Sequence, residues 1–159
     1  MSFIPSHIDG QKMVRTIERP VAAGSDFQDG ALLLANASNE FAECGADPAV
    51  IGAVAASGAG PDTDGFNRLG TRGFPPGYVQ AHWVGDEQVF SAEYVGALPA
   101  AAGGSYGVVK DADGRWKVDF AETVNTRVKL QSIKPTESPI NRPRVLVTFL
   151  PANVQVLAA

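Results

Sequence analysis

Few side chains in this sequence are of the types that carry out nucleophilic catalysis. Ser105 lies in the run Gly-Gly-Ser-Tyr-Gly at 103–107, which matches the G-x-S-x-G motif of α/β-hydrolases. Those enzymes place the catalytic histidine after the serine, whereas His7 and His82 both precede Ser105. Cys44, the single cysteine, has no papain-like sequence around it. We therefore expect Ser105 to lie in a glycine-rich strand entry, Cys44 to be structural, and the protein not to be an enzyme.

Two short aspartate motifs have the spacing that begins a calcium-binding loop. Residues 62–65 and 111–114 both read Asp-x-Asp-Gly. An EF-hand loop also needs a bidentate acid at its twelfth position, which is Gly73 for the first motif and Glu122 for the second. The residues before Glu122 alternate like a strand, and ordinary turns also favour Asp and Gly. We therefore expect turns at both places, and neither a metal nor a cofactor.

Composition excludes several broad classes of protein. The chain has 159 residues, of which 45% are hydrophobic and 19% charged, and its net charge is −4. These values indicate one globular domain without a nucleic-acid partner. No apolar run is long enough to cross a membrane, and no phosphate-binding glycine loop is present. The first residues lack the pattern of a secretory signal, so we expect folding in a reducing cytoplasm.

Alternation of apolar and polar residues predicts the strands that position these side chains. Strands are expected at 12–18, 30–36, 39–44, 50–57, 78–84, 88–95, 107–110, 115–120, 125–132, 143–150 and 153–157. The apolar faces of the later strands predict the main core residues. These are Trp83, Phe90, Trp116, Val118, Phe120, Val147 and Phe149.

The predicted fold is a compact all-β domain of sandwich-like or barrel-like architecture. Residues 58–77 contain six glycines and three prolines and are expected to form a long loop. This loop separates two expected sub-sheets, at 12–57 and 78–159, within a single domain at 12–159. Residues 1–11 lack periodicity and are expected to form an irregular N-terminal arm.

Four longer segments carry a resemblance to a known family. They are GALLLANASNEFAECGADPAVIGAVA at 30–55, VQAHWVGDEQVFSAEYVG at 79–96, GGSYGVVKDADGRWKVDF at 103–120 and PRVLVTFLP at 143–151. Their pattern of small residues, short turns and strands resembles the head-decoration, or cement, proteins of tailed bacteriophages, over roughly residues 28–155. The glycine- and proline-rich loop at 58–77 has no counterpart in that pattern.

The resemblance implies a β-tulip-like structural protein on the exterior of a phage capsid. It implies binding to the major capsid protein, stabilisation of the shell, and self-association as a dimer or trimer. Localisation would be the virion, preceded by the host cytoplasm during assembly. Within the arm, Phe3, Ile4, Pro5 and His7 are the expected capsid contacts, through strand addition. The alternative is another virion or surface β module, such as a tail, neck or carbohydrate-binding adhesion domain.

Overall fold

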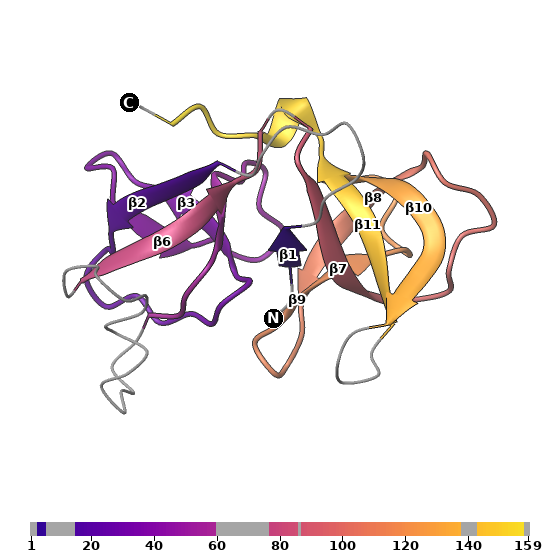
Figure 1. The fold of residues 1–159 in the computed structure, drawn as a ribbon, viewed down its shortest axis with the longest axis horizontal. Helices are drawn as coiled ribbons and strands as arrows, with labels where there is room; N and C mark the ends of the chain where they lie inside the picture. Colours follow the sequence, from indigo (N-terminus) through magenta and orange to yellow (C-terminus); the bar gives the residue numbers. More distant parts are fainter. Residues whose placement is uncertain (1–2, 6–14, 60–76, 86, 138–142, 158–159) are drawn as a thin grey trace.

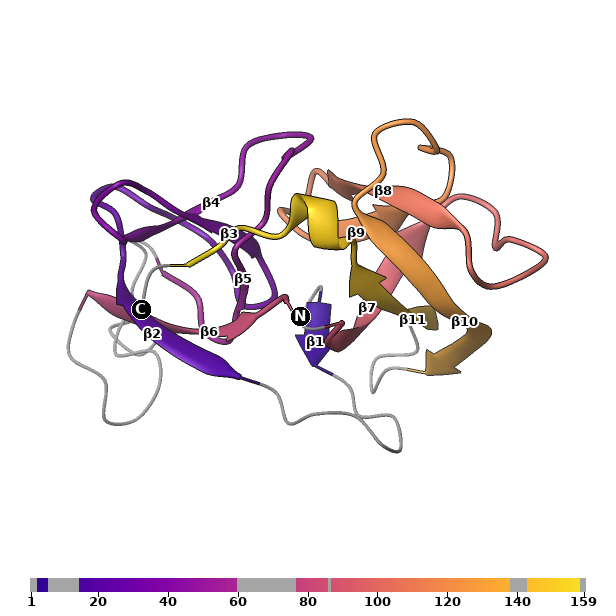
Figure 2. The same cartoon turned by 90° about the horizontal axis from the view of Figure 1, so that it is seen from above.

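A computed structural model of the chain describes residues 3–5, 15–59, 77–85, 87–137 and 143–157. Its strands fall into two groups that lie side by side, with the short strand β1 between them (Figures 1 and 2). The described residues contain one 3₁₀ helix, η1 (Pro151–Asn153), and no α-helix. No helix in these ranges is long and apolar enough to cross a membrane. The predicted all-β fold class is confirmed.

The first sheet has the strand order β2-β6-β5-β3-β4, and all of its strand pairs are antiparallel. Its strands are β2 (Thr16–Pro20), β6 (Tyr78–Trp83), β5 (Ala53–Ala55), β3 (Leu32–Ala35) and β4 (Phe41–Glu43). Just beyond β2, Val21 forms a parallel bridge with Phe41 of β4. The sheet is therefore curled, because this bridge brings its two end strands together.

The second sheet has the strand order β1-β7-β11-β10-β8-β9. Its strands are β1 (Phe3–Pro5), β7 (Val89–Val95), β11 (Pro143–Phe149), β10 (Val128–Glu137), β8 (Ser105–Lys110) and β9 (Trp116–Asp119). Strand β9 also pairs in parallel with β7, where Tyr94 faces Val118 and Val95 faces Asp119. This extra pairing closes β7, β11, β10, β8 and β9 into a mixed five-stranded barrel, and β1 adds to the free part of β7.

The division of strands between the two sheets differs from the expected one at β6. Strand β6 follows the glycine-rich segment but pairs with β2 and β5 of the first sheet. Ala81 of β6 faces Ile17 on one side and Ala55 on the other, so the small side chain fits between its neighbours. The boundary between the sheets therefore falls after β6, and not at 58–77. Residues 60–76 of the expected loop lie outside the described residues.

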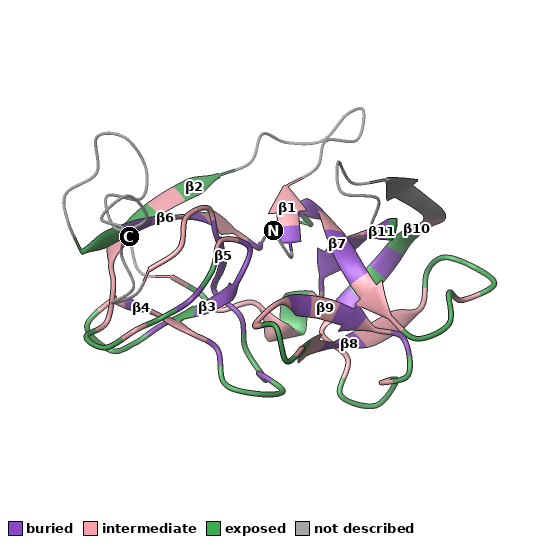
Figure 3. Ribbon diagram, turned by 90° about the horizontal axis from the view of Figure 1, so that it is seen from below, coloured by how far each residue is buried: buried purple, intermediate pink, exposed green. Residues whose placement is uncertain are grey.

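One hydrophobic core runs through both sheets. Buried residues concentrate on β3, β5, β7 and β11, whereas β2 is mostly exposed or intermediate (Figure 3). Six of the predicted core residues are buried, and they are Phe90, Trp116, Val118, Phe120, Val147 and Phe149. The prediction is wrong for Trp83, which is only partly buried. Its ring lies against Gly85, where a Cβ atom would come within 2.3 Å of the indole, and the neighbouring Val84 is buried instead.

Polar side chains join the two sheets. Glu43 of β4 accepts a hydrogen bond from Trp116 Nε1 at 2.8 Å through Oε1 and pairs with Lys110 Nζ at 2.7 Å through Oε2. Arg127 donates from Nε to the Pro48 carbonyl oxygen and lies 3.3 Å from an Asp47 carboxylate oxygen. These contacts fix the turn-rich face of the first sheet against β8, β9 and the segment before β10.

Candidate binding groove

The residues predicted to dock on a partner are placed mostly within the second sheet. Phe3, Ile4 and Pro5 form β1 and pair with Ala92, Ser91 and Phe90 of β7. Phe3 is 1% exposed and its ring lies 5.5 Å from that of Phe149. The expectation of an irregular arm is therefore wrong for these three residues, because pairing with β7 and burial of Phe3 anchor them. His7 lies outside the described residues.

The residues considered for catalysis lie apart from one another. Ser105 begins β8 and faces Lys129 of β10. Cys44 is buried, and its burial raises the pKa of the thiol to about 12. His82 is half-buried in β6, its Nδ1 has no hydrogen-bond partner among the described residues, and burial lowers the pKa of its imidazole. Because a thiol with so high a pKa stays protonated at neutral pH, Cys44 is a poor nucleophile.

The second aspartate motif forms a hairpin turn. Asp111 Oδ1 accepts hydrogen bonds from the main-chain N–H groups of Asp113 at 3.0 Å and Arg115 at 2.9 Å, and Oδ2 lies 2.6 Å from Lys117 Nζ. The hydrogen bond from Lys117, followed by those from the main chain, lowers the pKa of Asp111. Both carboxylate oxygens are therefore engaged within the β8–β9 hairpin. The first motif, at 62–65, is not among the described residues. In the described part of the chain, no three His, Cys, Asp or Glu side chains gather as metal ligands would.

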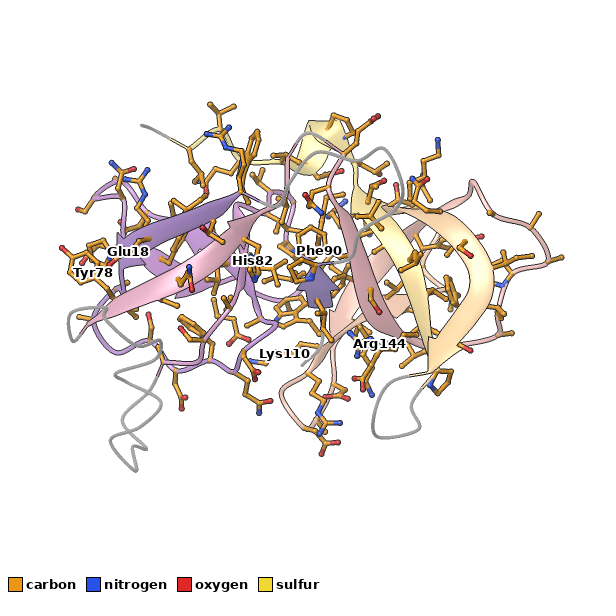
Figure 4. The ribbon with its side chains drawn as sticks, viewed as in Figure 1. Glu18, Tyr78, His82, Phe90, Lys110 and Arg144 are labelled. Atoms are coloured by element: carbon orange, nitrogen blue, oxygen red, sulfur yellow. The ribbon has the colours of Figure 1, made fainter. Side chains whose placement is uncertain are left out.

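A groove of about 370 Å³ lies between β2 and the C-terminal segment, on the first sheet. One wall is formed by Arg15, Thr16, Ile17 and Arg19 with Trp83, and the other by residues 154–157. Figure 1 shows the C-terminal segment running back from η1 toward β2. Figure 4 shows that Glu18 and Tyr78 mark the outer part of this sheet, whereas His82 lies toward the middle of the molecule. The groove is thus a surface feature of the first sheet.

The β2 wall of the groove has a regular chemical pattern. Ile17 faces Ala81 and Arg19 faces Val79 across the β2–β6 pair, while the carbonyl oxygen of Arg15 accepts from the N–H of Trp83. Side chains two residues apart on a strand share a face. Arg15, Ile17 and Arg19 therefore present a basic, apolar and basic side chain in succession along the same side of β2.

The guanidinium group of Arg15 is held over the indole ring of Trp83. Its carbon Cζ lies 5.1 Å from the ring centroid, which is within the range of a cation–π interaction. The indole in turn packs against Gly85. This stacking restricts the Arg15 side chain, so a basic group is held in position at the groove.

The opposite wall is fixed by the side chain of Gln155, which forms hydrogen bonds with the main chain of Ala35 as a neighbouring strand would. Gln155 Nε2 donates to the Ala35 carbonyl oxygen at 2.8 Å, and its Oε1 accepts from the Ala35 N–H at 2.9 Å. Val154 forms a parallel bridge with Ile51, and Gln155 N–H donates to the Ile51 carbonyl oxygen at 2.8 Å. Val156, which follows, is 93% exposed at the rim of the groove.

This groove was not predicted from the sequence. The sequence does indicate one wall, because Arg15, Ile17 and Arg19 occupy alternate positions along the chain. The other wall comes from residues almost 140 positions away, and it depends on the Gln155–Ala35 pairing. Searches found no matching protein-family model, no similar curated protein and no similar solved structure.

Proposed function

We propose that the protein is a structural virion component that binds the outer surface of a phage capsid and stabilises the shell. The resemblance of residues 28–155 to capsid cement proteins supports this function. Its partner would be the major capsid protein, and copies of the chain would associate on the lattice as dimers or trimers. The protein would act by binding, without catalysis or a cofactor.

The observation that carries this proposal is the incorporation of β1 and of residues 154–155 into the two sheets. Strand β1 pairs with β7 of the second sheet, and Val154 and Gln155 bind the first sheet. A protein that reinforces a shell must keep its shape when the shell is strained. Segments that are paired with a sheet and partly buried resist local unfolding.

Mass action explains how such binding would stabilise a shell. A protein that binds only the intact lattice adds RT ln(1 + [L]/Kd) per site, which is about 2.7 kcal/mol at a concentration of 100 times Kd. The experiment is to add purified protein to capsids of the source phage assembled without it. Occupancy would be counted by electron microscopy, and the temperature of DNA release would be measured. We expect decorated shells to release DNA at higher temperature, whereas absence of binding, or binding with unchanged release, would refute the proposal.

A second candidate function is that of an adhesion or tail module that binds a ligand. The observation in its favour is Trp83, which is partly exposed in a groove beside Arg15. Glycan-array binding by the purified protein, with the Trp83→Ala variant as control, tests this alternative. Retained glycan binding in that variant, or none in the parent protein, would count against it.

A further inference from the structure

Residues 153–157 bind the first sheet, although they follow β11 of the second sheet in the chain. We propose that two copies of the protein exchange this segment, so that residues 153–157 of each copy bind the first sheet of the other. Such an exchange goes beyond the capsid-binding function, because it concerns the free protein and names the contact that joins two copies.

The site that receives the exchanged segment lies just beyond the pairing of β3 with β5. The N–H and the carbonyl oxygen of Ala35 both bond to the side chain of Gln155, at 2.9 and 2.8 Å. The N–H of Ile51 donates to the Asn153 carbonyl oxygen at 2.7 Å, and the Ile51 carbonyl oxygen accepts from the Gln155 N–H at 2.8 Å. Because main-chain polar groups within a fold need partners, this acceptor site requires an extended chain with Gln at one position.

A second copy of the chain carries the ligand that fits the acceptor site. Its residues 153–157 have the sequence that already occupies this site within one copy. Each hydrogen bond between the segment and the sheet can therefore form between two copies as well, and exchange loses none of them. Reciprocal exchange of an identical element is a low-cost route to a closed dimer with two-fold symmetry.

The hinge for this exchange is formed by Leu150 and the helix η1. The Leu150 N–H donates to the Arg127 carbonyl oxygen at 2.9 Å, which fixes the start of the hinge on the second sheet. No residue of η1 is buried, so straightening the helix exposes no core side chain. From Leu150 to Asn153 an extended chain spans about 10 Å. Exchange over this short distance requires the acceptor sites of the two copies to face each other.

Exposed apolar side chains lie next to the contacts of the exchanged segment. Each is the chain neighbour of a residue whose hydrogen bonds are given above, and they are Leu34, Val50 and Val156, which are 36%, 38% and 93% exposed. Apolar side chains gathered on a surface are typical of protein–protein contacts. Face-to-face pairing of two acceptor sites would cover these side chains in both copies.

The first test measures the mass of the free protein by sedimentation equilibrium. The sample is full-length protein refolded from urea at high concentration, because exchange requires the segment to leave its own sheet. We expect a dimer, and we expect Val156→Asp to raise its dissociation constant at least about tenfold, since the variant places a charge in the covered apolar face. Val124→Asp is the matched control, because Val124 is also exposed, at 85%, but lies between β9 and β10. A monomer at all concentrations, or an equal effect of the Val124 variant, would overturn the proposal.

A disulfide bond distinguishes exchange from simple pairing of two faces. Ile51 and Val154 form a parallel bridge. Paired strands lie about 4.8 Å apart, which is within the Cα separation of disulfides. With Cys44→Ala as background, Ile51→Cys combined with Val154→Cys should give a covalent dimer on a denaturing gel after mild oxidation. The same background with Val154→Cys alone is the control and should stay monomeric on the gel.

A disulfide formed only within single chains would refute the exchange, even if the protein is a dimer in solution. Should the double cysteine variant fail to fold, the sedimentation measurements on the parent protein and its Val156 variant still decide the question. A protein that stays monomeric but binds capsids would overturn the exchange and leave the proposed capsid-binding function standing.

Discussion

Trp116 of β9 donates its indole N–H to the carboxylate of Glu43 in β4, at 2.8 Å, and so links the two sheets through a side-chain hydrogen bond. Trp116 is fully buried, whereas Lys110, the other partner of Glu43, has a side chain that is 38% exposed. The hydrogen bond of Glu43 with Trp116 and its ion pair with Lys110 therefore contribute unequally to the free energy of unfolding. Loss of an acceptor from a buried donor costs more than loss of an ion pair at the surface.

We predict that Glu43→Ala lowers the free energy of unfolding by about 1–3 kcal/mol, since it removes the acceptor of a buried N–H. Lys110→Ala, which removes only the more exposed ion pair, should cost less than about 1 kcal/mol. Glu43→Gln keeps an acceptor and should fall between the two. Urea denaturation of the three variants measures these differences, and equal losses for Glu43→Ala and Lys110→Ala would contradict the interpretation.

We predict that Phe3 is required for stability. Its side chain is 1% exposed and its ring contacts that of Phe149, so Phe3→Ala should cost about 3–5 kcal/mol, as for other buried aromatic residues. Ile4 is only partly buried, and Ile4→Ala is the matched control with a smaller expected loss. Thermal unfolding compares the two. A Phe3→Ala protein as stable as the parent would show that β1 contributes little to the core.

We predict that Gly52→Ala disturbs the C-terminal segment. A Cβ atom at this position would lie 2.5 Å from Gln155 Oε1, so the carboxamide would have to leave Ala35. The expected loss is about 1–2 kcal/mol, and it should not add to that of Gln155→Ala, because the second change removes the clash. Gly45→Ala is the control, since no atom lies within 4 Å of its Cβ position. Full additivity in the double variant would argue against this contact.

The stability of the protein should depend on pH through His82. Burial lowers the pKa of His82 below its ordinary value of 6.5. Below about pH 6.5 the unfolded chain therefore takes up a proton that the folded protein resists, and the free energy of unfolding falls as the pH drops. Above that pH both states are neutral and the contribution disappears. The facing residues across the strand pairs, Thr16 and Val54, carry no charge that would oppose this effect.

The measurement for His82 is urea denaturation at several pH values between 5 and 7. In the His82→Gln variant the free energy of unfolding should fall less with decreasing pH across that window. Asp111 and Glu122 also have lowered pKa values, so acidification removes their contributions too, but only near and below their ordinary pKa values of 3.8 and 4.5. A pH slope that is unchanged by His82→Gln would exclude His82 as its source.

Local patterns in the sequence were sufficient to predict most strands and much of the core. In residues 115–120, alternation alone identified Trp116, Val118 and Phe120, and all three are buried. Strand β1 is only three residues long, which is too short for a periodic pattern to appear. Its presence depends on a pairing with β7 almost 90 residues away in the chain.

Features that depend on distant contacts could not be predicted in this way. Alternation correctly placed Trp83 on the face of Val79 and Ala81, but it could not show that the strand ends there and that Gly85 leaves room for the ring. The groove has the same origin, because its walls meet only once residues 154–157 have returned to the first sheet. The charge and alternation of residues 15–19 indicate the first wall of the groove, whereas the second wall depends on the tertiary pairing of residues 154–157 with the first sheet.

Strand β1 and residues 154–155 each join the sheet that is built mainly from the opposite half of the chain, which limits where the coding sequence could be divided or recombined. The first residues complete the sheet that is formed mainly by the second half of the chain, and the last residues cover the sheet that is formed mainly by the first half. A fragment beginning at residue 78 would lack β1 and would carry β6 without β2 and β5. Neither half of the chain therefore contains all the strands of one sheet, so we expect the two sheets to be inherited together and not exchanged between proteins as separate modules.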